Sequence, residues 1–511
     1  MRSQFFIALP DGLRLDEVVR GVAGGKAFAQ DRERTVERTY YDTFDWRLYR
    51  AGLVLAHDVA AGEAWLEAAR LSSGEPAGRV PIAKVPRFAS DLPDGELQRD
   101  LAPVVDVRAL LPLVTTSSHV RVGRILDADS QTVLSIEEEA VRSPESPGGA
   151  DLGRRLRLFP QKGRPKPLRR WLSKLRDDFG LVPGEDDLYR RALSSVGRRP
   201  GDYSSKLTVP MPSHACAGEA FRRVMDALLE ALLANEEGVR HDVDSEFLHD
   251  FRVAIRRARS ILSSSRGALE PAAVEQLRPE LVWLQGATGR ARDLDVYLLD
   301  LPSYAASLPP GTGPHLEPLR KFLEGQRGAA YAELGQQLAT ARYRAVVTSW
   351  RGLGSGTTDE SQRSASEVAS DRIWRAYRRA ARQGRAIDSS TAAAELHELR
   401  KRCKRLRYLL EGFRELSPPK HVNRLVGELK ALQSNLGEFQ DCEVQAGDLQ
   451  RFARQMSEEG VGSADTLSTM SLLVDQLGDR QRRARQAFAA TFTAFDAPDN
   501  RTRFRKLFAP G

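Results

Sequence analysis

Two segments of this 511-residue chain, 249–262 and 397–410, carry nearly the same series of histidine and basic residues. A histidine opens each segment, and basic side chains follow three, seven, eight and ten positions later. Guanidinium and ammonium groups at this density suit an anion with several negative charges, because each can donate charge-assisted hydrogen bonds to its oxygens. The pattern therefore predicts a surface that binds a polyanion.

Helical spacing would place most of these residues on one face. At about 100° per residue, the histidine and the basic residues three, seven and ten positions later fall within about 80° of one another. The opposite face is apolar in both segments, which predicts two amphipathic helices. With one lysine from a later helix, the candidate ligand-binding residues are His249, Arg252, Arg256, Arg257, Arg259, His397, Arg400, Lys401, Lys404, Arg405, Arg407 and Lys430.

The repeat continues beyond these segments at the same offset of 148 residues. Leu284 and Gln285 recur as Leu432 and Gln433. Further on, Gly289, Asp293 and Val296 recur as Gly437, Asp441 and Val444. An internal duplication of this size predicts two similar helical units packed as a pseudo-symmetric pair, with the two basic faces able to face one another.

The chain changes character near residue 205. Before it, short β-like runs such as 52–57 and 132–138 alternate with turn residues, and after it helical periodicity dominates. Residues 201–213, which hold turn residues and two prolines, are the predicted linker. We expect no metal site or cofactor, because the three cysteines lack ligand spacing, and Cys403 and Cys442 fit core positions. No apolar run is long enough to span a membrane, so we expect a cytoplasmic protein that does not contact the membrane.

The duplicated pattern His-x-x-Arg-x-x-x-Arg/Lys-Arg-x-Arg, followed each time by Leu-Gln-x-x-x-Gly-x-x-x-Asp, resembles the CHAD family of histidine-bearing helical domains. The resemblance covers roughly residues 214–508. It implies that the chain binds inorganic polyphosphate in a basic groove between two four-helix halves and associates with polyphosphate granules. Through this likeness, His249 and His397 are expected to donate hydrogen bonds to phosphate.

Residues 40–53 resemble part of the CYTH domains, the triphosphate tunnel metalloenzymes, whose fold is an antiparallel β-barrel. Their hydrolysis requires Glu-x-Glu-x-Lys in the first strand, and residues 2–10 lack it. We therefore expect a degenerate, non-catalytic barrel. The predicted fold is multidomain α+β: an N-terminal barrel (1–200), the linker, and an all-α domain (214–511) of two pseudo-symmetric four-helix bundles, with repeats at about 214–350 and 367–508.

Other interpretations stay open at this stage. A nucleic-acid-binding protein could use the same basic helices, although Tyr408 is the single aromatic expected on their basic faces. A triphosphate hydrolase is less favoured, and other polyanions are possible ligands. Asp293, Asp295, Asp441 and Glu443 are expected to orient the basic side chains, and the acidic run 137–139 to be solvated. The basic block 154–176 could form a second polyanion contact or a solvated surface.

Overall fold

A computed structural model describes residues 5–23, 28–30, 33–126, 129–160, 165–184, 187–212, 214–354 and 356–510. The chain divides into two compact units, one up to residue 204 and one from residue 205 onward. The division lies inside the segment 201–213. Each unit is considered by itself below.

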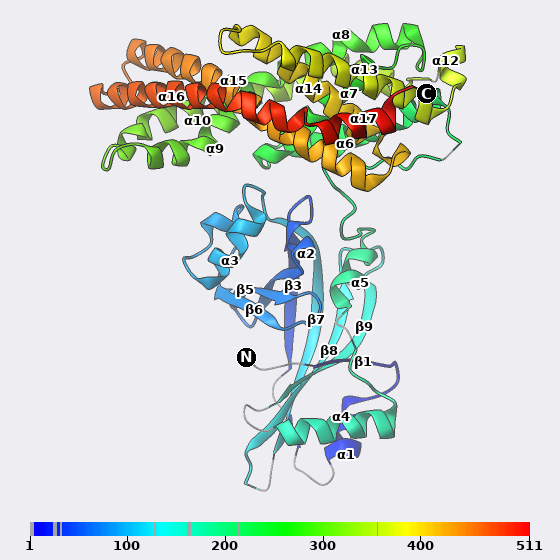
Figure 1. The fold of residues 1–511 in the computed structure, drawn as a ribbon. Coiled ribbons are helices and arrows are strands. Elements are labelled where there is room, and N and C mark those ends of the chain that lie inside the picture. Colours follow the sequence, from blue (N-terminus) through cyan, green and yellow to red (C-terminus); the bar gives the residue numbers. More distant parts are fainter. Residues whose placement is uncertain are drawn as a thin grey trace. The chain divides into compact units, whose positions relative to one another are not determined.

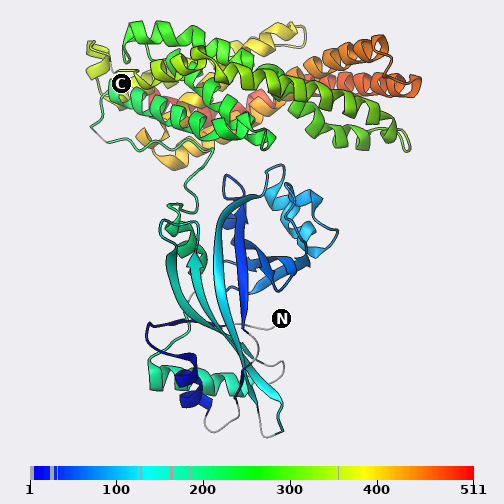
Figure 2. The same cartoon turned by 180° about the vertical axis from the view of Figure 1, so that it is seen from behind.

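The first unit is built on one antiparallel sheet. Its strands are β1 (Phe5–Leu9), β2 (Phe28–Gln30), β3 (Arg34–Asp42), β4 (Leu53–Ala60), β5 (Glu63–Arg70), β6 (Pro76–Pro81), β7 (Leu111–Leu126), β8 (Thr132–Ser143) and β9 (Ala150–Pro160). They follow the order β1-β9-β8-β7-β3-β4-β5-β6, and β2 pairs with β7. The sheet curls into a half-barrel (Figures 1 and 2). The predicted antiparallel barrel is thus found as a half-barrel, in which β1 and β6 stand at opposite ends of the described strand order.

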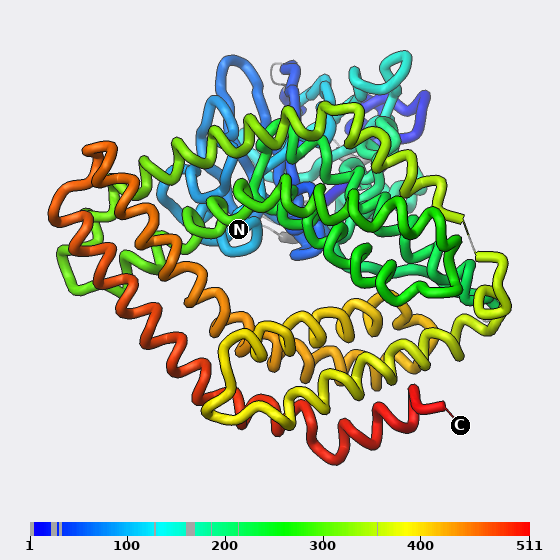
Figure 3. Tube along the Cα trace, turned by 90° about the horizontal axis from the view of Figure 1, so that it is seen from above, coloured from blue at the N-terminus to red at the C-terminus, as the bar shows by residue number. Residues whose placement is uncertain are grey.

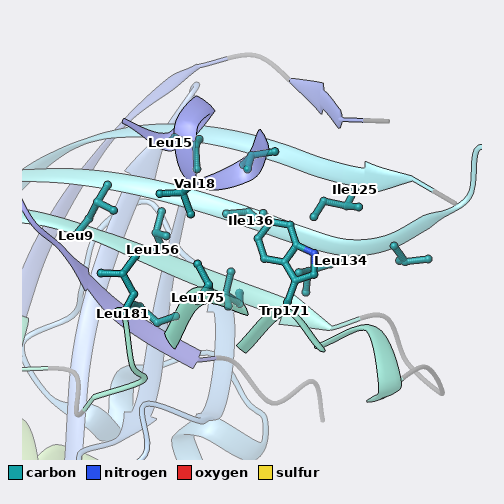
Figure 4. Close-up of a cluster of buried hydrophobic side chains, with 14 residues drawn as sticks. Leu9, Leu15, Val18, Ile125, Leu134, Ile136, Leu156, Trp171, Leu175 and Leu181 are labelled. Atoms are coloured by element: carbon teal, nitrogen blue, oxygen red, sulfur yellow. The ribbon is translucent and has the colours of Figure 1, made fainter. Parts of the chain in front are cut away.

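Short helices cover the sheet: α1 (Leu15–Ala23), α2 (Arg47–Arg50), α3 (Glu96–Val105), α4 (Pro165–Phe179) and α5 (Leu188–Ser195). Helices α1 and α4 pack on the ends of β7, β8 and β9 around an apolar cluster that includes Leu15, Ile136 and Leu156 (Figure 4). Trp171, the aromatic residue inside the basic block 154–176, belongs to this core and is 5% exposed.

The second unit is helical. Its helices are α6 (Ala217–Arg240), α7 (Ser245–Leu262), α8 (Pro271–Ala287), α9 (Gly289–Ser307), α10 (Glu317–Ala339), α11 (Ala341–Arg351), α12 (Asp359–Gln362), α13 (Ala365–Arg385), α14 (Ala393–Gly412), α15 (Pro419–Glu458), α16 (Ala464–Phe495) and α17 (Pro498–Phe508). No helix in the described ranges is both long and apolar enough to cross a membrane.

The order of helices repeats at the offset found in the sequence. Helices α6, α7 and α8 each begin 148 residues before α13, α14 and α15, respectively. The copies differ at Thr288, where the first copy breaks into α8 and α9 while the second continues as the 40-residue α15. Helices of the first copy (green) lie beside those of the second (yellow to red) in Figure 3. They meet where α7 contacts α14 and where Tyr297 of α9 donates a 2.7 Å hydrogen bond to Asp448 of α15.

Candidate polyanion-binding site

Helices α7 and α14 present their basic residues because their apolar faces are buried. Asp244 caps α7, accepting hydrogen bonds from the backbone N–H groups of Glu246 (2.9 Å) and Phe247 (3.2 Å). The predicted apolar faces are confirmed as core: Phe251, Ala254, Ile255, Ala258, Ile261 and Leu262 in α7, and Leu399, Cys403, Leu406, Leu409 and Leu410 in α14. The remaining faces are left to the basic side chains.

The two helices pack against each other through reciprocal contacts. Arg257 of α7 forms a 3.1 Å ion pair with Glu411 of α14. Arg405, the counterpart of Arg257 in the second copy, donates a 2.7 Å hydrogen bond to the carbonyl oxygen of Ser263, the counterpart of Glu411. The same pair of positions therefore meets twice, with the copies exchanged.

A cavity of about 810 Å³ opens between α9, α14, α15 and α16. Four predicted residues line it: Arg400, Lys404, Arg407 and Lys430. Arg480 of α16 joins them, and Asp300, Glu438 and Asp441 are the acidic residues of the lining. The structure thus brings most of the second basic face, with Lys430, into one hollow.

Charges of the first basic face act on the residues that line this cavity. Burial, together with the neighbouring charges of Arg400 and of Arg256 from α7, lowers the pKa of Lys404 to about 8. Burial likewise lowers the pKa of Arg252 to about 10, with Arg256 contributing by repulsion. We call Arg252, Arg256, Arg400, Lys404 and Arg407 the cationic cluster. Its charges come from both copies and lie close enough to oppose one another.

Several hydrogen-bond donors of this region have no partner. The buried Nε–H groups of Arg252, Arg256, Arg257 and Arg400 form no hydrogen bond within the described residues, and that of Arg407 faces Glu411 Oε1 at 3.7 Å, beyond hydrogen-bond distance. The side-chain nitrogen of Gln433, which lines the cavity, also forms no hydrogen bond with a described residue. Because buried polar groups usually find partners, a concentration of unpaired donors on two cationic helices points to an acceptor-rich ligand.

The terminal guanidinium nitrogens of Arg252 and Arg400 are held in place by the neighbouring helix. Arg252 Nη1 donates to the carbonyl oxygen of Gln285 (2.9 Å) and to Thr288 Oγ1 (2.7 Å), at the break between α8 and α9. In the unbroken α15, Arg400 instead forms a 3.0 Å ion pair with Asp441. A Cβ added at Gly437 would meet Arg400 Nη2 at 3.6 Å, an ordinary van der Waals contact, so an alanine would fit here while a longer side chain would crowd the arginine.

The two histidines occupy matching positions. His249 Nδ1 accepts a 3.0 Å hydrogen bond from Arg292, and His397 Nδ1 lies 2.7 Å from Gln440 Oε1. Arg292 and Gln440 are themselves related by the repeat offset. The neighbouring helix therefore orients both half-buried rings through Nδ1.

Other predicted residues lie outside the cavity. Arg259 donates a 2.7 Å hydrogen bond to Gln285 Oε1. Lys401 is exposed and paired with Glu398 at 2.7 Å. Arg405 does not line the cavity, and its guanidinium group donates instead to Ser264 Oγ (3.1 Å) and to the carbonyl oxygen of Ser263 (2.7 Å).

Of the acidic residues expected to orient the basic side chains, some contact the cationic cluster and others do not. Asp441 orients Arg400, as expected. Asp295 is buried instead against Arg327 (2.7 Å) and the hydroxyl of Tyr331 (2.8 Å). The aromatic prediction was wrong: Tyr408 is only 3% exposed, because α14 packs against α7, α13 and α15 and buries more than one face.

Sequence reasoning missed Arg480. It lies in α16, where the first copy has Ala332 at the equivalent position, so the duplication gives no signal for it. The available signal was the local basic run at 480, 482, 483 and 485.

In the first unit, the acidic run 137–139 is paired across β8 and β9 rather than solvated. Glu137, Glu138 and Glu139 pair with Arg157, Arg154 and Arg155, respectively. Burial opposes ionisation of Glu139, but Arg155, Arg38 and Arg157 outweigh it and hold its pKa below the usual value.

Arginine–carboxylate pairs also border a small cavity on the sheet. Arg38, paired with Asp58 at 2.6 Å, lines a hollow of about 70 Å³ together with Arg155 and Arg157. These arginines of the basic block are thus partnered within the sheet. Lys162, Arg164, the side chain of Lys166 and residues 1–4 lie outside the described residues.

Comparison with known protein families finds a match for part of the helical unit. The model of the CHAD domain matches residues 223–450. An uncharacterized protein of Mycobacterium tuberculosis is 24% identical over 343 residues, a match that covers 65% of this chain and 62% of that relative. The match therefore spans less than two thirds of the relative's length.

Two solved structures are similar to parts of the chain. The CHAD domain of the plant Ricinus communis is 23% identical, with a TM-score of 0.47 over 57% of this chain and 96% of its own. A candidate adenylate cyclase of Bacillus halodurans is 14% identical, with a TM-score of 0.26 over 37% of this chain and 96% of its own. The family match rests on the helical unit alone: residues 223–450 of this chain form a CHAD domain.

Proposed function

We propose that the cationic cluster binds inorganic polyphosphate. The observation that carries this proposal is the crowding of cations from both copies: burial, with the charges of Arg400 and Arg256, lowers the pKa of Lys404 to about 8, and buried arginine Nε–H groups nearby form no hydrogen bond within the described residues. An anion placed here would relieve the repulsion and supply the missing acceptors.

The spacing suits a linear phosphate chain. From Arg400 to Arg407, which both line the cavity, α14 rises about 10 Å, enough to contact several successive phosphates. Polyphosphate has no base edges that a protein could recognise, so a row of arginine and lysine side chains is sufficient to hold it. We propose, on the CHAD family's association with this polymer, that the protein works in the cytoplasm at polyphosphate granules.

We further propose that the two copies are related by an approximate twofold axis passing between α7 and α14. The reciprocal contacts of Arg257 with Glu411 and of Arg405 with Ser263 support it, since a twofold axis makes each contact occur twice. This arrangement would direct both basic faces toward one ligand.

Binding without hydrolysis is part of the proposal. The sheet carboxylates Asp58, Glu137 and Glu139 are each neutralised by an arginine, which leaves them poorly suited to holding a divalent metal. Nucleic acid is the competitor to be tested, although the burial of Tyr408 removes the single aromatic side chain that was expected on the basic faces.

The test is equilibrium binding of labelled polyphosphate to a variant with Arg252, Arg256, Lys404 and Arg407 changed to alanine. Losing four charge-assisted contacts should weaken binding at least about 100-fold while helicity is retained. A matched control changes the exposed cations Lys321, Arg344, Arg351 and Arg454 to alanine.

Undiminished affinity in the cluster variant would contradict the proposed site. Displacement of polyphosphate by single-stranded RNA at equal phosphate concentration would contradict specificity for polyphosphate.

A further inference from the structure

A second cavity, of about 870 Å³, lies between α13 and α17 and shares no lining residue with the first. Eight of its lining residues are basic and none of those described is acidic. The basic residues are Arg375, Arg378, Arg379, Arg382, Arg385, Arg501, Arg505 and Lys506.

Aromatic packing brings the two helices together. The rings of Tyr377 in α13 and Phe504 in α17 stack at 3.9 Å, and Phe495 lies against both at 6.1 and 6.2 Å. Helices α13 (yellow) and α17 (red) run side by side in Figure 3. This aromatic core holds the cationic faces of α13 and α17 close together. Its packing must therefore outweigh the repulsion between their charges.

Few carboxylates offset that repulsion. Arg385 pairs with Asp496 at 2.7 Å, and Arg375 with Asp371 at 3.4 Å. Among the described residues, no carboxylate forms an ion pair with the other six cations. Their exposed side chains therefore present a strongly positive hollow to an anion in solution.

The duplication shows that the fold does not require these charges. Helix α6 begins at the equivalent position in the first copy, and its residues matching the five α13 arginines are Ala227, Glu230, Ala231, Ala234 and Glu237. The same helix thus packs with alanine and glutamate on this face. The arginines of α13 extend over about 15 Å of one helix face.

We propose that the α13–α17 cavity is a second binding site, for a run of contiguous phosphoryl groups. The ligand is a free inorganic oligophosphate or the phosphate tail of a nucleoside triphosphate. Trp374 distinguishes the two sources: its partly exposed indole lines the same cavity and could stack on a base. The site is independent of the cationic cluster, so one protein could hold two phosphate chains at once.

The test uses the full chain with the cationic cluster already changed to alanine, so that residual binding reports on this cavity. Calorimetric titration with tripolyphosphate should still detect a site. Changing Arg378, Arg382, Arg501 and Arg505 to glutamine should weaken that binding at least about 30-fold, with an unchanged circular dichroism spectrum. The control changes Lys321, Arg344, Arg351 and Arg454 to glutamine.

A second pair of titrations, with ATP and with tripolyphosphate, distinguishes a nucleoside triphosphate from a free oligophosphate as the ligand. If Trp374→Leu weakens ATP at least fivefold and leaves tripolyphosphate unchanged, the site takes a nucleoside triphosphate. If ATP and tripolyphosphate bind alike and Trp374→Leu alters neither, it takes free oligophosphate. Unchanged tripolyphosphate affinity in the glutamine variant, or equal affinity for orthophosphate, would overturn the proposal. Since the cluster is absent throughout, failure here leaves the cluster's own function untouched.

Discussion

Lys404→Met should stabilise the protein while weakening its affinity for polyphosphate. Methionine keeps the length of the lysine side chain but removes a charge that is disfavoured by burial and repelled by Arg400 and Arg256. Lowering a lysine pKa from 10.5 to about 8 costs the charged form about 3 kcal/mol. Because half-buried Lys404 keeps part of its hydration, we expect a gain of about 1–2 kcal/mol in the free energy of unfolding.

The effect on binding has the opposite sign. Without Lys404 the cluster loses one charge-assisted contact, so affinity for polyphosphate should fall about tenfold. A residue that costs stability in the free protein and contributes to binding is expected at a functional site, where charges are held together for a ligand.

The dependence on pH gives an independent check. Between pH 8 and 10.5 the unfolded chain binds more protons at Lys404 than the folded protein does, so the stability of the unsubstituted protein should rise with pH in this window. The gain in the free energy of unfolding from Lys404→Met should therefore be largest below pH 8 and disappear above about pH 10.5. Polyphosphate affinity should decline as pH rises past 8, because the bound state needs the charged lysine.

Urea unfolding followed by circular dichroism, at pH 7 and at pH 10.5, measures the stability change, and calorimetry measures the affinity. The matched control is Lys401→Met, an exposed lysine of the same helix, which should shift stability by less than about 0.5 kcal/mol. A loss of stability in Lys404→Met at pH 7 would refute the reasoning that the cluster is under electrostatic strain.

Three further outcomes are expected. Asp295→Asn should lower the free energy of unfolding by about 2–3 kcal/mol in urea titrations, because the buried carboxylate that accepts from Arg327 is lost; no change would show that the pair is dispensable. Glu139→Gln should destabilise the sheet unit by about 2–4 kcal/mol in calorimetric scans at pH 7. Because the pKa of the Glu139 carboxyl is lowered in the folded protein, the unsubstituted protein should lose this stabilisation as pH falls below 4.5. Gly437→Ala should retain polyphosphate affinity, whereas Gly437→Leu should weaken it by displacing Arg400; equal affinities would argue that Arg400 does not bind.

The sequence predicted the parts of the site that follow helical periodicity. The buried faces of α7 and α14 and the equivalent starts of the helices agree with it, because a core-facing stripe and a duplication are both written directly in residue spacing. The wrong placement of Tyr408 also comes from reasoning on residue spacing. A single helical wheel assumes one buried face, and α14 lies among three other helices.

Tertiary partners could not be predicted. The run Glu137–Glu139 looks like a solvated acidic patch until β9 places an arginine beside each carboxylate. The hollow between α13 and α17 depends on Tyr377 and Phe504, which are distant in sequence and meet only in the fold. Arg480 joins the first cavity in the same way, from a helix outside the repeated motif.

The most direct measurement is a crystal structure of the protein with a short polyphosphate bound. The account predicts successive phosphates along Arg400, Lys404 and Arg407, with Arg256 contacting the chain from α7. Phosphates ordered elsewhere, with the cationic cluster free of ligand, would contradict it.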